Sequence, residues 1–200
     1  MKSINSFLII IFVTVFTSVA LSERPPASTA TGVFVSAGVG PRLPIGDFAG
    51  TTDLGYGLSL ELSYTDSDNL PFFVFSRLGF EQYPGSQSFY QTSQYSNFST
   101  QSIPIELGVR YYFAPLVESV VLLMPVIEVA ADFAFIKRIH EFKIGSGRTN
   151  FTEENSKFGF SGGVGFSMFL LEIMVAYHYY QSQQYISANL SVRLPLFINY

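Results

Sequence analysis

Two histidines are the only imidazole groups that could act as general bases in this sequence of 200 residues. His140 lies beside Glu141 in a polar segment, and His178 is followed by two tyrosines. A histidine that activates a nucleophile needs a serine or a carboxylate within reach, and neither histidine shows a His-x-Ser spacing. Without cysteine there is no thiolate nucleophile, and two isolated histidines do not predict a zinc site. We therefore expect no enzyme, no metal site and no cofactor.

Ten ionisable residues lie at positions that a β-strand would direct to one face, because strand side chains alternate between two faces. They are Glu61, Arg77, Glu81, Glu106, Arg110, Glu128, Asp132, Glu172, His178 and Arg193. A desolvated charge without a partner costs several kcal/mol, so we expect these side chains to form a hydrogen-bonded network. Its six carboxylates outnumber its three arginines, which predicts trapped water, bound cations or protonated carboxyl groups.

The segments that carry these residues alternate apolar and polar residues with a period of two, which predicts β-strands. In the second segment, for example, Leu60 lies on the apolar face and Glu61 on the other face. Eight segments show this pattern, and no amphipathic helix of ordinary length is predicted. The segments are residues 32–40, 54–65, 72–83, 101–113, 121–137, 157–168, 171–181 and 185–200. Pro104, Pro125 and Pro195 fall within them and predict bulges or shifted strand ends.

The connections between these segments alternate in length. Long connections cover residues 41–53, 84–100 and 138–156, whereas short ones cover residues 66–71, 114–120 and 169–170. Only the last link, residues 182–184, breaks the alternation. Long loops at one rim and short turns at the other are typical of outer-membrane barrels, whose short turns face the periplasm. An even number of strands then predicts that both ends of the barrel lie in the periplasm.

Composition decides which face of such a barrel points inward. A soluble lipocalin-like barrel would turn its apolar residues inward and its charges outward. However, only 13% of the residues are charged, against roughly 25% in soluble domains, and 48% are hydrophobic. The charged face also carries many Gly and Ser residues, which suit a crowded interior. We predict an all-β, eight-stranded antiparallel up-and-down transmembrane β-barrel with the charges inside.

The N-terminal residues 1–22 have the pattern of a secretory signal peptide, with Lys2, an apolar run from Phe7 to Val19 and small residues before Glu23. The apolar run is shorter than the roughly 20 residues that a spanning helix needs, so cleavage is expected rather than an anchor. Cleavage would change the formal net charge from −4 to −5 by removing Lys2. We expect residues 23–31 to form a short periplasmic lead-in and residues 32–200 to form the barrel in the outer membrane.

Apolar residues alternate to the end of the chain, at Val192, Leu194, Leu196, Ile198 and the terminal Tyr200. This pattern resembles the closing strand of outer-membrane β-barrels, which ends in an aromatic residue preceded by alternating apolar positions. Residues 43–49 and 54–57 also resemble the first outer loop and second strand of the small eight-stranded OmpA- and OmpX-like barrels. The resemblance implies that the C-terminal residues form an assembly signal for the barrel-assembly machinery and that outer-membrane lipid surrounds the barrel. It implies architecture only, since activity does not follow from this fold.

Residues 84–100 combine Phe89, Tyr90, Tyr95 and Phe98 with many Ser, Gln, Thr and Asn residues. Similar mixtures form binding paratopes, although a disordered polar loop has the same composition. We predict a monomeric structural or surface-binding, adhesin-like barrel with extracellular loops, a polar, plugged lumen and an unidentified extracellular ligand. The alternative is a narrow, cation-preferring diffusion pore, although eight strands leave an interior only just wide enough for side chains. No basic run predicts nucleic-acid binding.

Overall fold

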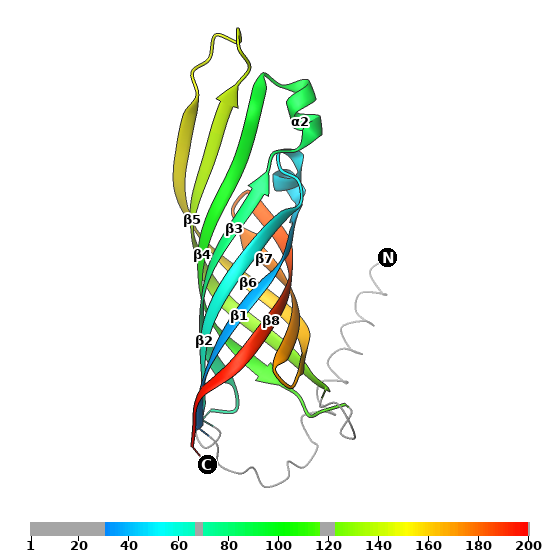
Figure 1. Ribbon diagram of the computed structural model, residues 1–200, viewed down its shortest axis with the longest axis vertical. Helices are drawn as coiled ribbons and strands as arrows, with labels where there is room; N and C mark the ends of the chain where they lie inside the picture. The colour runs from blue at the N-terminus through cyan, green and yellow to red at the C-terminus, as the bar shows by residue number, and fades with distance from the viewer. Residues whose placement is uncertain (1–30, 67–69, 117–122, 200) are drawn as a thin grey trace, which may run out of the picture.

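The chain folds into a closed ring of eight antiparallel strands, each paired with its neighbours in sequence order and β1 paired with β8 (Figure 1). This computed structural model describes residues 31–66, 70–116 and 123–199. The strands are β1 (Thr31–Ile45), β2 (Gly55–Asp66), β3 (Phe73–Pro84), β4 (Tyr95–Tyr112), β5 (Leu123–Phe142), β6 (Phe151–Met168), β7 (Leu171–Tyr180) and β8 (Gln183–Asn199). Two short helices, η1 (Gly46–Gly50) and α2 (Gln87–Thr92), lie in the connections at one rim. The predicted signal peptide, residues 1–22, and most of the predicted lead-in lie outside the described residues.

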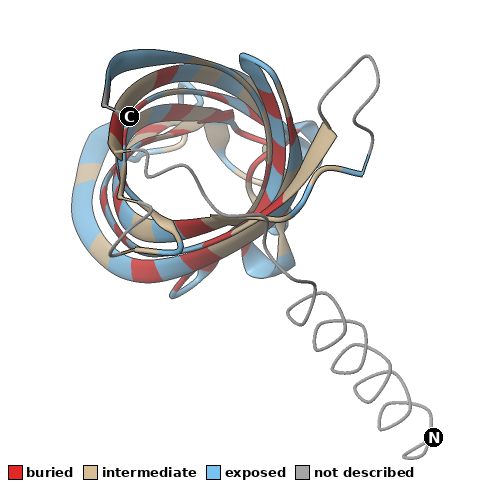
Figure 2. Cartoon of the chain, turned by 90° about the horizontal axis from the view of Figure 1, so that it is seen from below, coloured by how far each residue is buried: buried red, intermediate tan, exposed pale blue. Residues whose placement is uncertain are grey.

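The two faces of the strands divide as the sequence pattern predicts. Leu58, Leu60 and Leu62 of β2 are exposed on the outer wall, whereas Glu61 between them is buried in the lumen. Seen along the barrel, buried and exposed residues alternate along the strands (Figure 2). A polar interior inside an apolar exterior reverses the arrangement of a soluble barrel and is that of a transmembrane barrel. The predicted fold class is therefore confirmed. Within the described part of the chain, no helix has the length and hydropathy needed to cross a membrane.

The three prolines within the strands have different effects. Opposite Pro195, the β1–β8 register shifts between Val33 and Phe34, so the predicted irregularity is present there. The β3–β4 register is the same on both sides of Pro104. Pro125 pairs in register with Phe166 of β6, close to the start of β5. The prediction of a bulge or shifted strand end is therefore wrong at Pro104, where the side chain packs beside Gly79 instead.

Four strands continue five or six residues beyond their predicted outer ends, and the first of them is β1, which continues to Ile45 rather than to residue 40. Strand β4 begins at Tyr95 rather than at residue 101, β5 continues to Phe142 rather than to residue 137, and β6 begins at Phe151 rather than at residue 157. We call the extension of β4, β5 and β6, residues 95–100, 138–142 and 151–156, the raised sheet; it projects above the rest of the barrel in Figure 1. Much of the predicted long loops is therefore regular strand. Beyond the apolar belt both faces can carry polar residues, so the alternation ends while the backbone ladder continues.

Candidate functional site

Arg77 lies at the centre of the lumen and bonds to three carboxylates from different strands. Its Nη2 is 2.8 Å from Glu61 Oε2 of β2 and 3.0 Å from Glu128 Oε2 of β5, and its Nη1 is 2.6 Å from Glu106 Oε2 of β4. All four side chains are buried. Charge-assisted bonds of this kind are stronger than neutral ones, so Arg77 ties together the four consecutive strands β2 to β5.

Arg110 and Arg193 extend this network across the lumen. Arg110 Nη1 is 2.7 Å from Glu61 Oε1, and Arg110 Nη2 is 2.5 Å from Glu128 Oε2. Arg193 Nη2 is 3.0 Å from Glu172 Oε2, and Glu172 also accepts a hydrogen bond from the Tyr112 hydroxyl at 2.8 Å. The structure thus brings seven of the ten predicted lumen residues into one cluster of shared contacts.

A second lumen cluster forms around Glu81 nearer the rim that carries the raised sheet. Glu81 Oε1 accepts hydrogen bonds from Arg42 Nε at 2.7 Å and from the Tyr185 hydroxyl at 3.0 Å, and Glu81 Oε2 accepts one from the Tyr83 hydroxyl at 2.9 Å. Gly57 leaves room for Arg42, since a Cβ at that position would lie 2.7 Å from the guanidinium carbon. Arg42 is therefore a fourth lumen arginine.

Sequence reasoning missed Arg42 because it ended the first strand at residue 40. The parity of that strand continues through Arg42, which pairs with Gly55 of β2 and Ser187 of β8. Extending the alternation by two residues would have placed Arg42 on the polar face. The predicted surplus of carboxylates over arginines is correspondingly smaller.

The two remaining predicted lumen residues, Asp132 and His178, form a third cluster with two serines. His178 Nε2 is 3.0 Å from Ser187 Oγ, His178 Nδ1 is 3.4 Å from Asp132 Oδ2, and Ser161 donates to Asp132 Oδ1 at 3.0 Å. The order serine, histidine, aspartate is that of a hydrolytic triad. However, Asp132 and Ser187 are completely buried, so a substrate has no access to the serine hydroxyl in this conformation. The cluster joins β5, β6, β7 and β8 by hydrogen bonds.

Little space remains between these side chains. A void lined by Ser36, Glu61, Arg77 and Asn189, among others, has a volume of about 10 Å³. One water molecule needs roughly 10–15 Å³, so this void holds about one. At this level of the barrel the lumen is filled by side chains.

The four predicted loop-binding residues do not lie in an irregular loop. Phe89 and Tyr90 belong to α2, whereas Tyr95 and Phe98 belong to β4. The Phe89 ring centroid is 5.0 Å from that of Tyr95 and 5.5 Å from that of Phe98. Three of these rings therefore pack against one another. The composition of residues 84–100 alone does not predict this packing.

These rings belong to a larger aromatic core on the inner side of the raised sheet. His140 stacks on Phe151 with 4.3 Å between ring centroids, and Tyr95 stacks on Phe142 at 4.6 Å. His140 Nδ1 is also 3.2 Å from the Tyr95 hydroxyl. His140, predicted in a polar loop segment, is thus a buried member of this core. The rings stiffen a sheet that has no barrel wall behind it.

Helix α2 is held by a side-chain cap at its start, by Lys143 just beyond the end of β5, and by Tyr90, which bonds to the raised sheet. The Ser86 side chain caps the helix by accepting from Phe89 N at 3.3 Å. Lys143 Nζ donates to Tyr90 O and to Ser93 O, each at 2.9 Å. The Tyr90 hydroxyl both donates to Phe98 O at 2.8 Å and accepts from Phe98 N at 2.9 Å. Tyr90 therefore covers the backbone groups of β4 beyond the end of β3.

The residues of the predicted assembly signal follow the outer wall of β8. Val192, Leu194, Leu196 and Ile198 are all exposed there. Strand β8 closes the ring by pairing with β1, from Ile45 opposite Gln184 to Thr31 opposite Asn199. The terminal Tyr200 lies outside the described residues. Exposure on this wall is compatible with contact to lipid, and the role in assembly stays a prediction.

A scan of protein-family models gives no match, and neither does a search of curated protein sequences. Among solved structures, the chain is similar to Neisserial surface protein A, with 14% identity over 84% of this chain and 99% of that chain and a TM-score of 0.46. It is also similar to Ail, the attachment invasion locus protein of Yersinia pestis (14% identity, 84% and 100% coverage, TM-score 0.45). The N-terminal β-barrel domain of Pseudomonas aeruginosa OprF gives 12% identity, 84% and 99% coverage and a TM-score of 0.42.

These similarities concern the fold alone. The chain has the architecture of the small eight-stranded outer-membrane β-barrels, as the sequence resemblance predicts, and the strand pairing given above establishes it. At 12–14% identity, no ligand or activity carries over from these proteins.

Proposed function

We propose that this protein is an outer-membrane barrel that binds other proteins at the cell surface, by pairing an extended segment of the partner with the free edge of the raised sheet. One observation carries the proposal. Strand β6 begins to pair with β7 only at Gly159, opposite Tyr180, so within the described chain residues 151–158 have no strand on that side. The edge of β6 faces away from β4 and β5 at the top of Figure 1. This function includes no catalytic step.

Placement in a membrane is supported by the outer wall. Leu60, Leu107, Val129 and Val164 are among its exposed apolar residues. Tyr64 is exposed near one end of β2 and Tyr56 near the other, and aromatic residues of this kind form girdles at the two interfaces of outer-membrane barrels. We infer that outer-membrane lipid surrounds this wall in a monomeric barrel.

Orientation follows from the two rims. Thr31 and Asn199 pair at the rim opposite the raised sheet. The two-residue turn between β6 and β7 lies at that same rim. We infer that this rim faces the periplasm after removal of the signal peptide and assembly by the barrel-assembly machinery. The raised sheet then projects outward from the cell.

The free edge is suited to pairing because its backbone groups have no partner strand. An unpaired edge offers a row of N–H and C=O groups, and adding a strand to it is a recurrent mode of peptide recognition. Residues 151–158 contain no proline and no glycine, so the edge is regular. Glu153, Glu154 and Lys157 lie on it, and charges at an edge oppose indiscriminate pairing. The opposite edge of the raised sheet is covered by Tyr90 and α2.

A pair of proline variants tests the proposal. Successive N–H groups of a strand point to opposite sides, so Glu154→Pro and Asn155→Pro each remove a donor, one from the free edge and the other from the β5 ladder. Phage-displayed octapeptides are selected on the protein in lipid nanodiscs. We expect the selected peptides to be rich in β-branched residues and free of proline.

The variants give the decisive comparison. The proline variant that loses the free-edge donor is expected to keep the wild-type stability and to lose peptide binding. The other proline variant loses an N–H donor to β5 and is expected to destabilise the sheet. Peptides that bind both variants as well as the wild type would place the binding surface elsewhere. The filled lumen does not favour the diffusion pore as an alternative function.

A further inference from the structure

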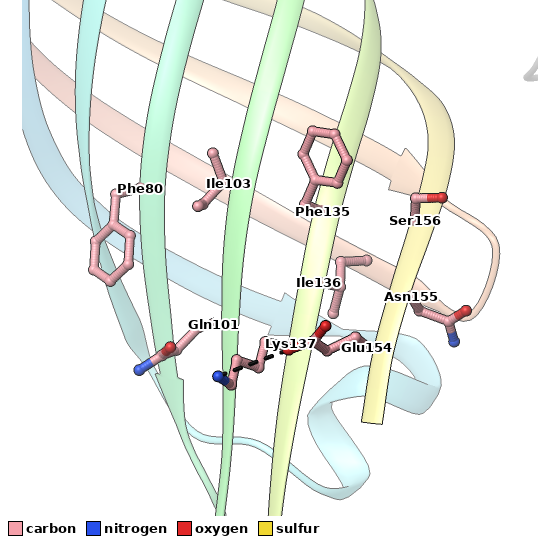
Figure 3. Close-up of a pocket in the computed structure, with 9 residues that line it drawn as sticks. All are labelled: Phe80, Gln101, Ile103, Phe135, Ile136, Lys137, Glu154, Asn155 and Ser156. Carbon is pink, nitrogen blue, oxygen red and sulfur yellow. Dashed lines mark ion pairs between the residues drawn. The ribbon is translucent and has the colours of Figure 1, made fainter. Parts of the chain in front are cut away.

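A hollow of about 580 Å³ lies on the outer wall where the barrel meets the raised sheet. It is lined by residues of β3, β4, β5 and β6, chiefly Phe80, Gln101, Ile103, Phe135, Lys137 and Glu154 (Figure 3). Its volume lies within the range of roughly 300–1,000 Å³ that is usual for small-molecule sites. The β6 residues of this lining belong to the free edge proposed above, whereas the residues on β3, β4 and β5 do not.

The lining changes from apolar to polar along the strands. Phe80, Ile103 and Phe135 are exposed on the side of the barrel, whereas Gln101 and Lys137 follow one outward position closer to the raised sheet. The ladder pairs Ile103 with Phe135 and Gln101 with Lys137, so the change occurs at the same level on both strands. A ligand that fits this gradient has an apolar part on the membrane side and a polar head on the outer side.

The polar end of the hollow holds charges of both signs. Lys137 Nζ lies 3.8 Å from Glu154 Oε1 on the neighbouring strand, and both side chains are well exposed, at 48% and 75%. An exposed ion pair contributes little to stability, so each partner can exchange the other for a ligand group at little cost. A purely anionic head would meet Glu154, and a purely cationic head would meet Lys137. A head that carries both charges complements both side chains.

We propose that this hollow binds a phospholipid with a phosphoethanolamine head. The phosphate contacts the Lys137 ammonium and the Gln101 amide, and the primary ammonium of the lipid contacts the Glu154 carboxylate. The first methylene groups of the acyl chains lie on Phe80, Ile103 and Phe135. This inference rests on the membrane placement proposed above. The bound lipid would fix the height of the raised sheet above the bilayer surface.

Lipid retention tests this site. The protein is reconstituted in nanodiscs that contain equal amounts of phosphatidylethanolamine, phosphatidylcholine and phosphatidylglycerol with identical acyl chains. Retained lipid is then counted by native mass spectrometry after mild detergent extraction. We expect phosphatidylethanolamine to be enriched on the wild type, and Lys137→Gln and Glu154→Gln each to lower that enrichment about two- to fivefold, as the loss of one exposed charge contact predicts.

The control and the contrary outcomes are distinct. Glu141→Gln changes a residue higher on β5 that accepts a hydrogen bond from Asn97, and it is expected to leave retention unchanged. Preferential retention of phosphatidylglycerol, or equal retention of phosphatidylcholine and phosphatidylethanolamine, would overturn the proposed head group. Insertion with no lipid preference would overturn the site itself. Failure of the wild type to insert would instead overturn the membrane placement on which the site rests.

Discussion

Arg77 and Arg110 lie on the neighbouring strands β3 and β4, and both guanidinium groups pack on the ring of Phe75, each with Cζ 4.8 Å from the ring centroid. They also share the carboxylates of Glu61 and Glu128. The two like charges stay close because acidic groups from β2 and β5 bridge them and both pack on the same aromatic ring. The shared carboxylates make the charged residues of the lumen one connected network rather than a set of independent ion pairs.

Arg110→Met should be strongly destabilising. Methionine fills similar space but leaves Glu61 and Glu128 without one of their cations, and breaking a buried pair costs about 3–5 kcal/mol. The measurement is a urea titration of refolding into bilayers. Arg193→Met is the matched control, since Arg193 lies at the edge of the network with contacts of 3.0–3.5 Å and should cost less. Equal losses for the two variants would contradict the central role of Arg110.

The sequence pattern predicted the faces of the barrel better than the lengths of its strands. Leu60 and Glu61 fall on opposite faces because lipid on one side and a crowded lumen on the other impose strict alternation. No such constraint acts above the membrane, where residues 138–142 keep the β5 ladder without that pattern. The raised sheet and its aromatic core could not be found by periodicity, because His140, Phe142 and Phe151 come together only after the strands extend.

Strict alternation also made it possible to predict which residues face the lumen. It did not predict which of them would form hydrogen bonds or ion pairs with one another. Parity places Glu81 inside the barrel, but it does not specify which residues it meets. Its contacts with Arg42 and Tyr185 depend on the stagger of β1, β3 and β8 around the ring. Stagger is set by closure of the whole barrel, which one strand does not encode.

Leu60→Arg tests the orientation of the outer wall. Leu60 is 60% exposed in the middle of β2, and an arginine facing lipid at the bilayer midplane costs about 2–4 kcal/mol. Refolding titrations in bilayers measure the loss. Ile144→Arg is the control, because Ile144 is fully exposed to water in the turn between β5 and β6. A negligible loss at Leu60 would favour a soluble barrel.

Planar-bilayer recording tests the plugged lumen. We expect no steady conductance from inserted wild-type protein, because the side chains around Arg77 leave a void of only about 10 Å³. Replacing both Arg77 and Arg110 by alanine should admit a small cation-selective current, since Glu61, Glu106 and Glu128 would remain as fixed negative charges. A steady current through the wild type would restore the diffusion pore as the function. Insertion is verified by proteolysis from the outer side.

Removal of residues 198–200 tests the C-terminal assembly signal. The deletion shortens β8 at the end that pairs with the start of β1, where Thr31 lies opposite Asn199 and Gly32 opposite Ile198. We expect the truncated protein to be absent from the outer membrane, because the barrel then lacks the last part of its closing ladder. The measurement is heat-modifiable migration of outer-membrane fractions in gels. A truncated protein that still forms a heat-modifiable barrel would show that these residues are dispensable.

Tyr90→Phe tests how the second edge of the raised sheet is protected. The substitution keeps the ring but removes the hydroxyl that donates to Phe98 O and accepts from Phe98 N. Loss of such a bond costs about 1 kcal/mol net, so the Phe98 amide should exchange with solvent about fivefold faster. Amide hydrogen exchange measured by NMR in nanodiscs gives this rate. Tyr177→Phe is the control, since it removes an exposed hydroxyl that donates to Gln184 on the barrel wall. Unchanged exchange at Phe98 would mean that α2 as a whole, rather than the Tyr90 hydroxyl, shields the β4 edge. Faster exchange together with concentration-dependent self-association would show that an uncovered edge of this sheet does recruit another strand.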